Sequence, residues 1–299
     1  MKEGEIYFVS NRLDRPAHVT ATSRVAGRAP QLWNAVTGKV EPVSYKSADG
    51  LTSVPLRLPP YGSLFVVFRT PTRSESVSVP DPKPTTLLRL HGPWTVAFQA
   101  DRGAPPSAEF PHLASWSDNA AAGVKYFSGT GTYTHRFPLT RAQAAGHLFL
   151  DLGQVYDLAT VTVNGRMAGI VWTPPFRIDI TKYVRPGANT VSIAVTNLWV
   201  NRIIGDQQPG VRKKYTFTTI PTYEPGAPLR RSGLLGPVRI EEEAGRAQSG
   251  CNVLCVHRSG ERRSGGPHTQ LPVPTPLLAP CAGGRHRAGR VHDARGLSG

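Results

Sequence analysis

The stretch "VTNLWVNRIIGDQQ" (residues 195–208) begins as an alternating β-strand and ends in side chains that could recognise a ligand. An indole offers a flat apolar face to a sugar ring, and amide, guanidinium and carboxylate groups can hydrogen-bond its hydroxyls. We therefore treat the loop that follows this strand as a candidate sugar-binding loop. Its candidate ligand-binding residues are Asn197, Trp199, Asn201, Arg202 and Asp206.

The same residues also allow a purely structural interpretation. By strand alternation Asn197 continues the inward face of the strand, and an inward amide without hydrogen-bond partners costs about 1–3 kcal/mol. Asn197 would then bind neighbouring loop backbone, and Trp199 would close the end of the core. Arg202 and Asp206 would form an ion pair that fixes the loop. The sequence leaves both interpretations open.

The elements that must position this loop are β-strands. With 39% hydrophobic residues, 30 Gly and 28 Pro in 299 residues, the composition favours many short strands and turns over long helices. Val191, Ile193 and Val195 alternate toward one face, and Asn164-Gly165 is typical of a type I′ hairpin turn. Only residues 140–146 look helical. We predict an all-β protein.

Four segments follow from the pattern. Residues 1–70 predict a small antiparallel β-sandwich, which could be incomplete, because Val54, Leu56 and Leu58 share one strand face. Residues 71–86, rich in Pro, Ser and Thr, predict a linker. Residues 87–243 predict a second antiparallel sandwich of the jelly-roll type, since successive strands have no helices between them.

The last segment, residues 244–299, has a different composition. It contains no Ile, Phe, Trp, Tyr, Lys or Met, and such a segment cannot bury enough apolar surface to offset its ordering entropy. We expect a disordered tail, whose Arg, Gly, Pro and Cys content suggests a shifted reading frame from about Ala244. All three cysteines lie there, so the preceding segments need no disulfide.

Charge and motifs exclude several classes of function. The net charge is +15, and residues 244–299 contribute eight Arg against two acidic residues. The remaining positive charge is spread along the chain, whereas nucleic-acid-binding proteins cluster it on one surface. Net charge is therefore the only feature that would support nucleic-acid binding, and we do not expect it. No apolar stretch is long enough for a membrane helix, and the N-terminus has no signal-peptide core.

Metal and catalytic motifs are also missing from the pattern. Asp151, Asp157 and Asp179 lie near strand ends, but no loop has the dense ligand spacing of a calcium site. Trp94, Trp116 and Trp172 are expected in the core. A glycosidase needs two carboxylates about 5–9 Å apart, and no spacing singles out such a pair. The residues alone predict no catalytic group.

A longer pattern resembles a known family. The motifs "FSGTGTYTHRF", "VNG", "TPPFRIDIT", "TNLWVNRIIGDQQ" and "SGLLGPVRI" resemble the C-terminal β-sandwich of glycoside hydrolase family 106, the α-L-rhamnosidases. Part of this pattern is shared with galactose-binding-like domains of other glycosidases. The first segment, with "IYFVSNR" and "LPPYGSLFVVFR", also looks like the β-domain that precedes it in that family. The resemblance covers residues 4–242, and residues 244–299 match nothing.

The resemblance implies a parent enzyme that hydrolyses α-L-rhamnosyl linkages of plant cell-wall or other rhamnose-containing glycans, with calcium assistance. That parent would be secreted or periplasmic. Its catalytic carboxylates would lie on an upstream barrel domain, which this chain is expected to lack, so no residue here inherits a catalytic role or needs a cofactor.

Two functions follow. The first is a non-catalytic accessory fragment that supports the missing catalytic domain and could bind glycan. The alternative is a free-standing carbohydrate-binding module without an enzyme partner.

Overall fold

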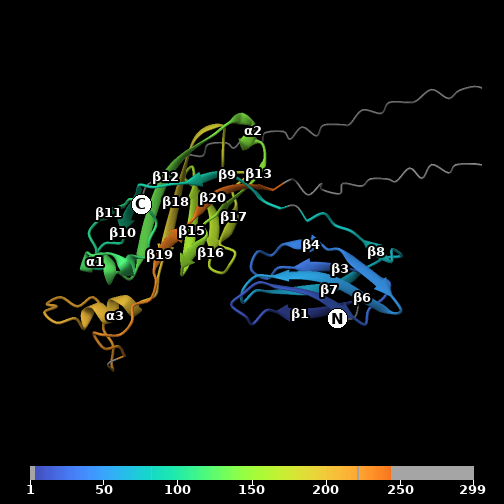
Figure 1. The fold of residues 1–299 in the computed structure, drawn as a ribbon, viewed down its shortest axis with the longest axis horizontal. Coiled ribbons are helices and arrows are strands. Elements are labelled where there is room, and N and C mark those ends of the chain that lie inside the picture. Colours follow the sequence, from blue (N-terminus) through green and yellow to red (C-terminus); the bar gives the residue numbers. More distant parts are fainter. Residues whose placement is uncertain (1–3, 82, 221, 244–299) are drawn as a thin grey trace, which may run out of the picture. The chain divides into compact units, whose positions relative to one another are not determined.

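The fold was determined as a computed structural model, which describes residues 4–81, 83–220 and 222–243. These residues form several sheets in which all pairings between named strands are antiparallel. The prediction of a mostly β protein is therefore confirmed (Figure 1). The expected disordered tail, residues 244–299, lies outside the described residues.

Two four-stranded sheets form the N-terminal part. The first, in the order β1-β7-β3-β4, contains β1 (Glu5–Ser10), β7 (Ser63–Pro71), β3 (Arg28–Trp33) and β4 (Val40–Pro42). The second, in the order β2-β6-β5-β8, contains β2 (Ala17–Ser23), β6 (Leu51–Leu58), β5 (Tyr45–Ala48) and β8 (Ser76–Val77). Strand β8 lies inside the segment that was expected to be a linker, and it pairs with β5.

Both four-stranded sheets contribute residues to the hydrophobic core of this part. Val54 and Leu56 of β6 are buried with Val66 and Phe68 of β7 in one hydrophobic cluster. Alternation along β6 places Val54, Leu56 and Leu58 on one face, and all three are buried as predicted. The alternation of apolar residues along β6 therefore identified its buried face. This works because one face of each strand packs against the core and the other faces solvent.

Three further sheets form the part from residue 85 onward. A six-stranded sheet, in the order β11-β10-β12-β18-β15-β16, contains β11 (Ser107–Phe110), β10 (Trp94–Phe98), β12 (Thr130–Leu139), β18 (Gly187–Thr196), β15 (Leu158–Val163) and β16 (Arg166–Val171). A four-stranded sheet, in the order β17-β13-β20-β9, contains β17 (Arg177–Asp179), β13 (His147–Asp151), β20 (Val238–Glu243) and β9 (Thr85–Leu90). Two short strands, β14 (Gln154–Tyr156) and β19 (Gly233–Gly236), pair with each other.

One large hydrophobic cluster joins these sheets. Val161 and Ile193 of the six-stranded sheet belong to the same cluster as Leu148 and Ile240 of the four-stranded sheet, and all four are fully buried. Val191 and Val195 point inward with Ile193, as the alternation predicted. The cluster shares no residue with the N-terminal one.

Local signals for turns were accurate. Asn164 and Gly165 have φ values of 50° and 77° between the paired strands β15 and β16, as a type I′ hairpin requires. The helical prediction at residues 140–146 is confirmed by α2 (Arg141–Ala144), whose N-cap Thr140 forms a capping box with Gln143. Trp94 and Trp116 are buried as expected.

Three predictions about individual elements were wrong. Residues after Thr196 form a helix, α3 (Val200–Asp206), where a loop was expected, and a 3₁₀ helix η1 (Trp116–Asp118) and a short helix α1 (Ala122–Lys125) were also missed. Trp172 was expected in the core but is 60% exposed beyond edge strand β16. Helix α3 contains β-branched residues and Gly205, which are poor helix formers, so its stability comes from tertiary contacts.

Candidate functional site

A half-open groove of about 580 Å³ lies where the end of strand β18 passes into helix α3. Its walls come from residues 156 and 157 at the end of β14, residues 197, 198, 200 and 201, and residues 223 and 228–231 before β19. The volume is within the range of small-molecule sites, about 300–1,000 Å³. The candidate sugar-binding residues therefore lie beside a real concavity, but only two of the five line it.

Asn197 is one of the two, and both its amide oxygen and its amide nitrogen bind the protein backbone. Its Oδ1 accepts a hydrogen bond from the backbone N–H of Gly129 at 2.9 Å, and its Nδ2 donates to the carbonyl of Phe127 at 2.9 Å. The residue is 9% exposed. Asn197 therefore holds the chain before β12 in place, as the structural interpretation expected.

Asn201 is the second, and it holds the opposite wall of the groove. Its Nδ2 donates to the carbonyl of Arg230 at 2.7 Å, and its Oδ1 accepts from the backbone N–H of Arg230 at 2.8 Å. Asn201 is 1% exposed. This pair of bonds fixes the backbone of residue 230, which lies in a segment with no regular secondary structure.

Arg202 and Asp206 form a buried ion pair behind the groove. Arg202 Nε lies 2.9 Å from Asp206 Oδ1, and the side chains are 6% and 1% exposed. The two atoms meet as an ion pair and not in a well-aligned hydrogen bond. Asp206 Oδ2 accepts from the backbone N–H groups of Tyr215 and Thr216 and from the Thr216 hydroxyl. The pair therefore anchors the chain after α3.

Trp199 lies outside the groove lining. It is 47% exposed, and the guanidinium of Arg102 lies 4.8 Å from the centre of its ring. The indole does not close the end of the core, and Arg102 already occupies one position near it. Sugar binding by these five residues stays a prediction. Their geometry fits a structural role, because the amides of Asn197 and Asn201 bind backbone groups and Arg202 pairs with Asp206 inside the protein.

Other residues supply the polar atoms that the groove presents. Tyr156, Asp157, Tyr223, Arg230 and Arg231 all line it and are partly or fully exposed. Of these residues, the sequence had indicated Asp157, as a carboxylate near a strand end with no link to the loop, and it had not indicated the arginines. Residues 223–231 carry no periodicity, so the sequence offered no signal that they fold back over α3.

Asp157 is the acidic group of the groove. Partial burial raises the pKa of its carboxyl, while a hydrogen bond from the backbone N–H of Leu198 and the charge of Arg230 lower it in part. The Leu198 bond, 3.1 Å long, reaches Oδ2. The net pKa is above the ordinary value of an aspartate. Asp157 thus lines the groove with a carboxyl group whose Oδ2 is bonded to the Leu198 backbone.

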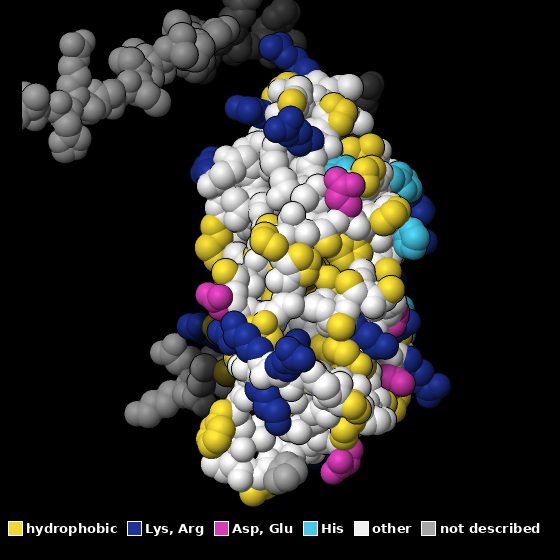
Figure 2. Space-filling model, turned by 90° about the vertical axis from the view of Figure 1, so that its left-hand side faces the viewer, with side chains coloured by type: hydrophobic (Ala, Val, Ile, Leu, Met, Phe, Trp, Pro, Cys, Tyr) yellow, Lys and Arg dark blue, Asp and Glu magenta, His cyan; other side chains and the backbone are white. Residues whose placement is uncertain are grey.

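The surrounding surface is basic. Figure 2 shows Lys and Arg side chains in both the upper and the lower part of one face of the molecule. Arg212, Lys213 and Lys214, which follow α3 along the chain, are exposed. An anionic ligand is therefore favoured electrostatically over a cationic one near this end of the molecule.

The groove lacks the carboxyl pair of a glycosidase. Among the described residues that line it, Asp157 is the sole carboxylate, whereas the reaction requires two that flank the scissile bond. Within residues 4–81, 83–220 and 222–243, no group of three or more His, Cys, Asp or Glu side chains could hold a metal ion. No helix in this part of the chain is long and apolar enough to cross a membrane.

Removing the Asn201 amide should release the Arg230 wall of the groove. We expect Asn201→Ala to lower the free energy of unfolding by about 1–3 kcal/mol, since it leaves the backbone N–H and carbonyl of Arg230 without their partner. Urea unfolding followed by tryptophan fluorescence measures the change. A loss no larger than that of an exposed control, Asn34→Ala, would contradict the assignment.

Comparison with known proteins points to one family. Residues 1–47 match the glycoside hydrolase family 106 model, described as alpha-L-rhamnosidase. The solved structure of a rhamnosidase from a Novosphingobium species superposes with a TM-score of 0.76 and is 48% identical over 81% of this chain. A "Putative beta-glucuronidase" from Formosa agariphila is 35% identical over 188 residues, 54% of this chain.

The matches span a small part of these relatives. This chain covers 23% of the Novosphingobium rhamnosidase and 16% of the Formosa agariphila protein. The similarity therefore concerns a region of larger proteins. This chain is therefore similar to one region of the glycoside hydrolase family 106 α-L-rhamnosidases.

Proposed function

We propose that this chain is a non-catalytic accessory region of an α-L-rhamnosidase-like glycoside hydrolase. It supports the catalytic barrel of that enzyme, and its groove binds glycan. The observation that carries the proposal is the match to the Novosphingobium rhamnosidase, which extends over 81% of this chain and over 23% of that one. In this proposal the second set of sheets is a galactose-binding-like jelly roll.

The groove supports the non-catalytic role. Its described lining offers one carboxylate, Asp157, so an acid and a base cannot both be placed across a glycosidic bond there. Tyrosine rings, a carboxylate and guanidinium groups are nevertheless suited to holding a sugar. The groove can therefore bind a saccharide without cleaving it.

The architecture around α3 supports a role in assembly. Asp206 anchors the backbone at Tyr215 and Thr216, immediately before Phe217, which is 88% exposed, and Ile220, which is 69% exposed. Large apolar side chains held in solvent by a buried ion pair are typical of an interaction surface. In the proposed parent enzyme this segment faces another domain.

Partners, metal and location follow from the proposed parent. The ligand is a plant cell-wall or other rhamnose-containing glycan, and the protein partner is the catalytic domain. In this proposal calcium acts in the parent enzyme. The parent is secreted or periplasmic.

Hydrolysis of 4-nitrophenyl α-L-rhamnopyranoside by the purified 299-residue chain tests the non-catalytic role. We expect release of nitrophenol at the rate of the buffer blank, with and without calcium. Turnover above the blank that disappears in Asp157→Asn, while the variant remains folded, would contradict the proposal.

A free-standing carbohydrate-binding module is the second candidate. The groove favours it, because all of its lining comes from this chain. The two candidates differ in whether Phe217 and Ile220 have a partner. Binding of a separately expressed rhamnosidase catalytic domain, weakened by Phe217→Ser, supports the accessory role. Full glycan binding with no such association supports the free-standing module.

A further inference from the structure

We propose that the groove beside α3 selects acidic saccharides, with Arg230 and Arg231 binding the carboxylate of a uronic acid residue. This inference rests on the proposed glycan-binding function and specifies its ligand class.

The groove presents more positive than negative charge. Arg230 and Arg231 line it together with one carboxylate, Asp157. Elsewhere in the described chain, partly buried arginines meet acidic partners: Arg177 pairs with Glu241 and Glu243. No acidic side chain among the described residues lies within ion-pair distance of Arg230 or Arg231. Arg230 influences Asp157 only through its charge.

The backbone that carries these arginines is held on both sides. Asn201 bonds the N–H and the carbonyl of Arg230. Two residues later, the buried Ser232 donates its backbone N–H to Ser115 Oγ at 3.0 Å, and its carbonyl accepts from the N–H of Trp116 at 3.0 Å. The guanidinium groups are thus mounted on a fixed backbone, which reduces the ordering cost of binding.

Guanidinium chemistry matches a sugar carboxylate. The planar guanidinium group can donate two parallel hydrogen bonds to one carboxylate. Such charge-assisted hydrogen bonds are roughly twice as strong as neutral ones. A neutral sugar offers only hydroxyl acceptors to the same groups. Selection of a carboxylate over its uncharged ester is therefore the expected behaviour of this groove.

The remaining groove atoms suit the rest of a sugar ring. The amides of Asn197 and Asn201 are engaged with backbone, so they are not ligand groups. Tyr156 and Tyr223 supply aromatic surface and hydroxyl groups. The carboxylate of Asp157, which accepts one hydrogen bond from the backbone N–H of Leu198, can also accept from sugar hydroxyls. A volume of about 580 Å³ accommodates a short oligosaccharide.

Isothermal titration calorimetry of the full 299-residue chain tests the inference. The ligands are trigalacturonic acid, the same trisaccharide with its carboxylates methyl-esterified, and a neutral rhamnose-containing oligosaccharide. We expect the acidic trisaccharide to bind at least tenfold more tightly than its ester at low ionic strength, and added salt to reduce this difference.

Variants locate the site. Arg230→Gln and Arg231→Gln should each weaken binding of the acidic trisaccharide about tenfold and leave binding of the ester unchanged. Arg212→Gln is the matched control, because Arg212 is exposed in the same basic region but does not line the groove. Its affinity should equal that of the unmodified chain. Circular dichroism confirms that each variant is folded.

The outcomes separate the two proposals. Equal affinity for acid and ester would overturn the selection of acidic saccharides and leave glycan binding intact. Tight binding of the acid that persists in both groove variants, or falls equally in Arg212→Gln, would overturn the assignment to this groove. No binding of any of the three oligosaccharides by the folded chain would overturn glycan binding itself.

Discussion

Replacing Asp206 with alanine should lower the free energy of unfolding by about 3–5 kcal/mol, because it leaves the buried Arg202 guanidinium without its counter-charge. The two side chains are 6% and 1% exposed and meet at 2.9 Å. The substitution also removes the acceptor of the backbone N–H groups of Tyr215 and Thr216.

Chemical denaturation followed by tryptophan fluorescence measures this effect. Asp206→Asn is the matched control, since its side-chain oxygen can still accept from residues 215 and 216 while the charge is lost. Its destabilisation should be smaller than that of Asp206→Ala. If both variants unfold at the denaturant concentration of the unmodified chain, the ion pair is not a structural anchor, and Arg202 and Asp206 regain their candidacy as ligand groups.

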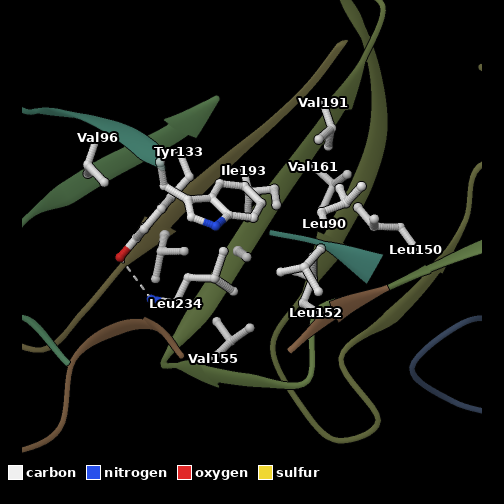
Figure 3. Packing of buried hydrophobic residues seen from close by; sticks show 14 of the residues in the cluster. Leu90, Val96, Tyr133, Leu150, Leu152, Val155, Val161, Val191, Ile193 and Leu234 are labelled. Carbon is white, nitrogen blue, oxygen red and sulfur yellow. Dashed lines mark hydrogen bonds between the residues drawn. The ribbon is translucent and has the colours of Figure 1, made fainter. Parts of the chain in front are cut away.

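The second large effect is expected at Gly233, in the "SGLLGPVRI" motif. Gly233 has φ +92°, and a Cβ there would lie 2.7 Å from the Trp116 indole and 2.8 Å from the Tyr133 hydroxyl. Trp116 and Tyr133 are fully buried with nearly parallel rings. Figure 3 shows the hydrogen bond from the backbone N–H of Leu234 to the Tyr133 hydroxyl, 3.0 Å long, in the same cluster.

Gly233→Ala should therefore lower the free energy of unfolding by about 3 kcal/mol, since it adds backbone strain to overpacking. Two glycines with open space around them separate these causes. Gly210 has φ +80° and nothing within 4 Å, so Gly210→Ala reports strain alone. Gly226→Ala should cause neither backbone strain nor overpacking, because Gly226 also has open space around it and its φ lies outside the left-handed region.

Thermal unfolding of the three variants gives the ranking. The expected order of destabilisation is Gly233→Ala, then Gly210→Ala, then Gly226→Ala with almost no change. A Gly233→Ala variant as stable as Gly226→Ala would mean that the motif does not pack against Trp116 and Tyr133. Burial already raises the pKa of the Tyr133 hydroxyl well above its usual value, consistent with a tightly enclosed site.

The strands could be predicted because their signals are local. One buried face produces alternation, as at Val191, Ile193 and Val195, and the Asn164-Gly165 pair produces its hairpin through backbone preference. Helix α3 could not be predicted in this way. Its residues are poor helix formers, and the spacing of Arg202 and Asp206, four residues apart on one helix face, was the only available signal.

The candidate site could be located but not assigned from the sequence. The polar residues after β18 do lie beside the groove, yet a sequence does not reveal whether a polar side chain meets a ligand or another part of the chain. Asn197 and Asn201 bind backbone at Phe127 and Arg230, and such partners come from distant segments. The arginines that line the groove, Arg230 and Arg231, lie in a segment without hydrophobic periodicity, so the sequence did not indicate their position.

The most direct test of the account is a crystal structure of the chain soaked with the saccharide that binds it best in solution. We expect the sugar in the groove, in contact with Asp157 and Arg230, with the Arg202–Asp206 pair unchanged behind it. A sugar stacked on Trp199 or bound to Arg202 and Asp206, with the groove free of ligand, would contradict the account and restore the polar residues of α3 as the binding site.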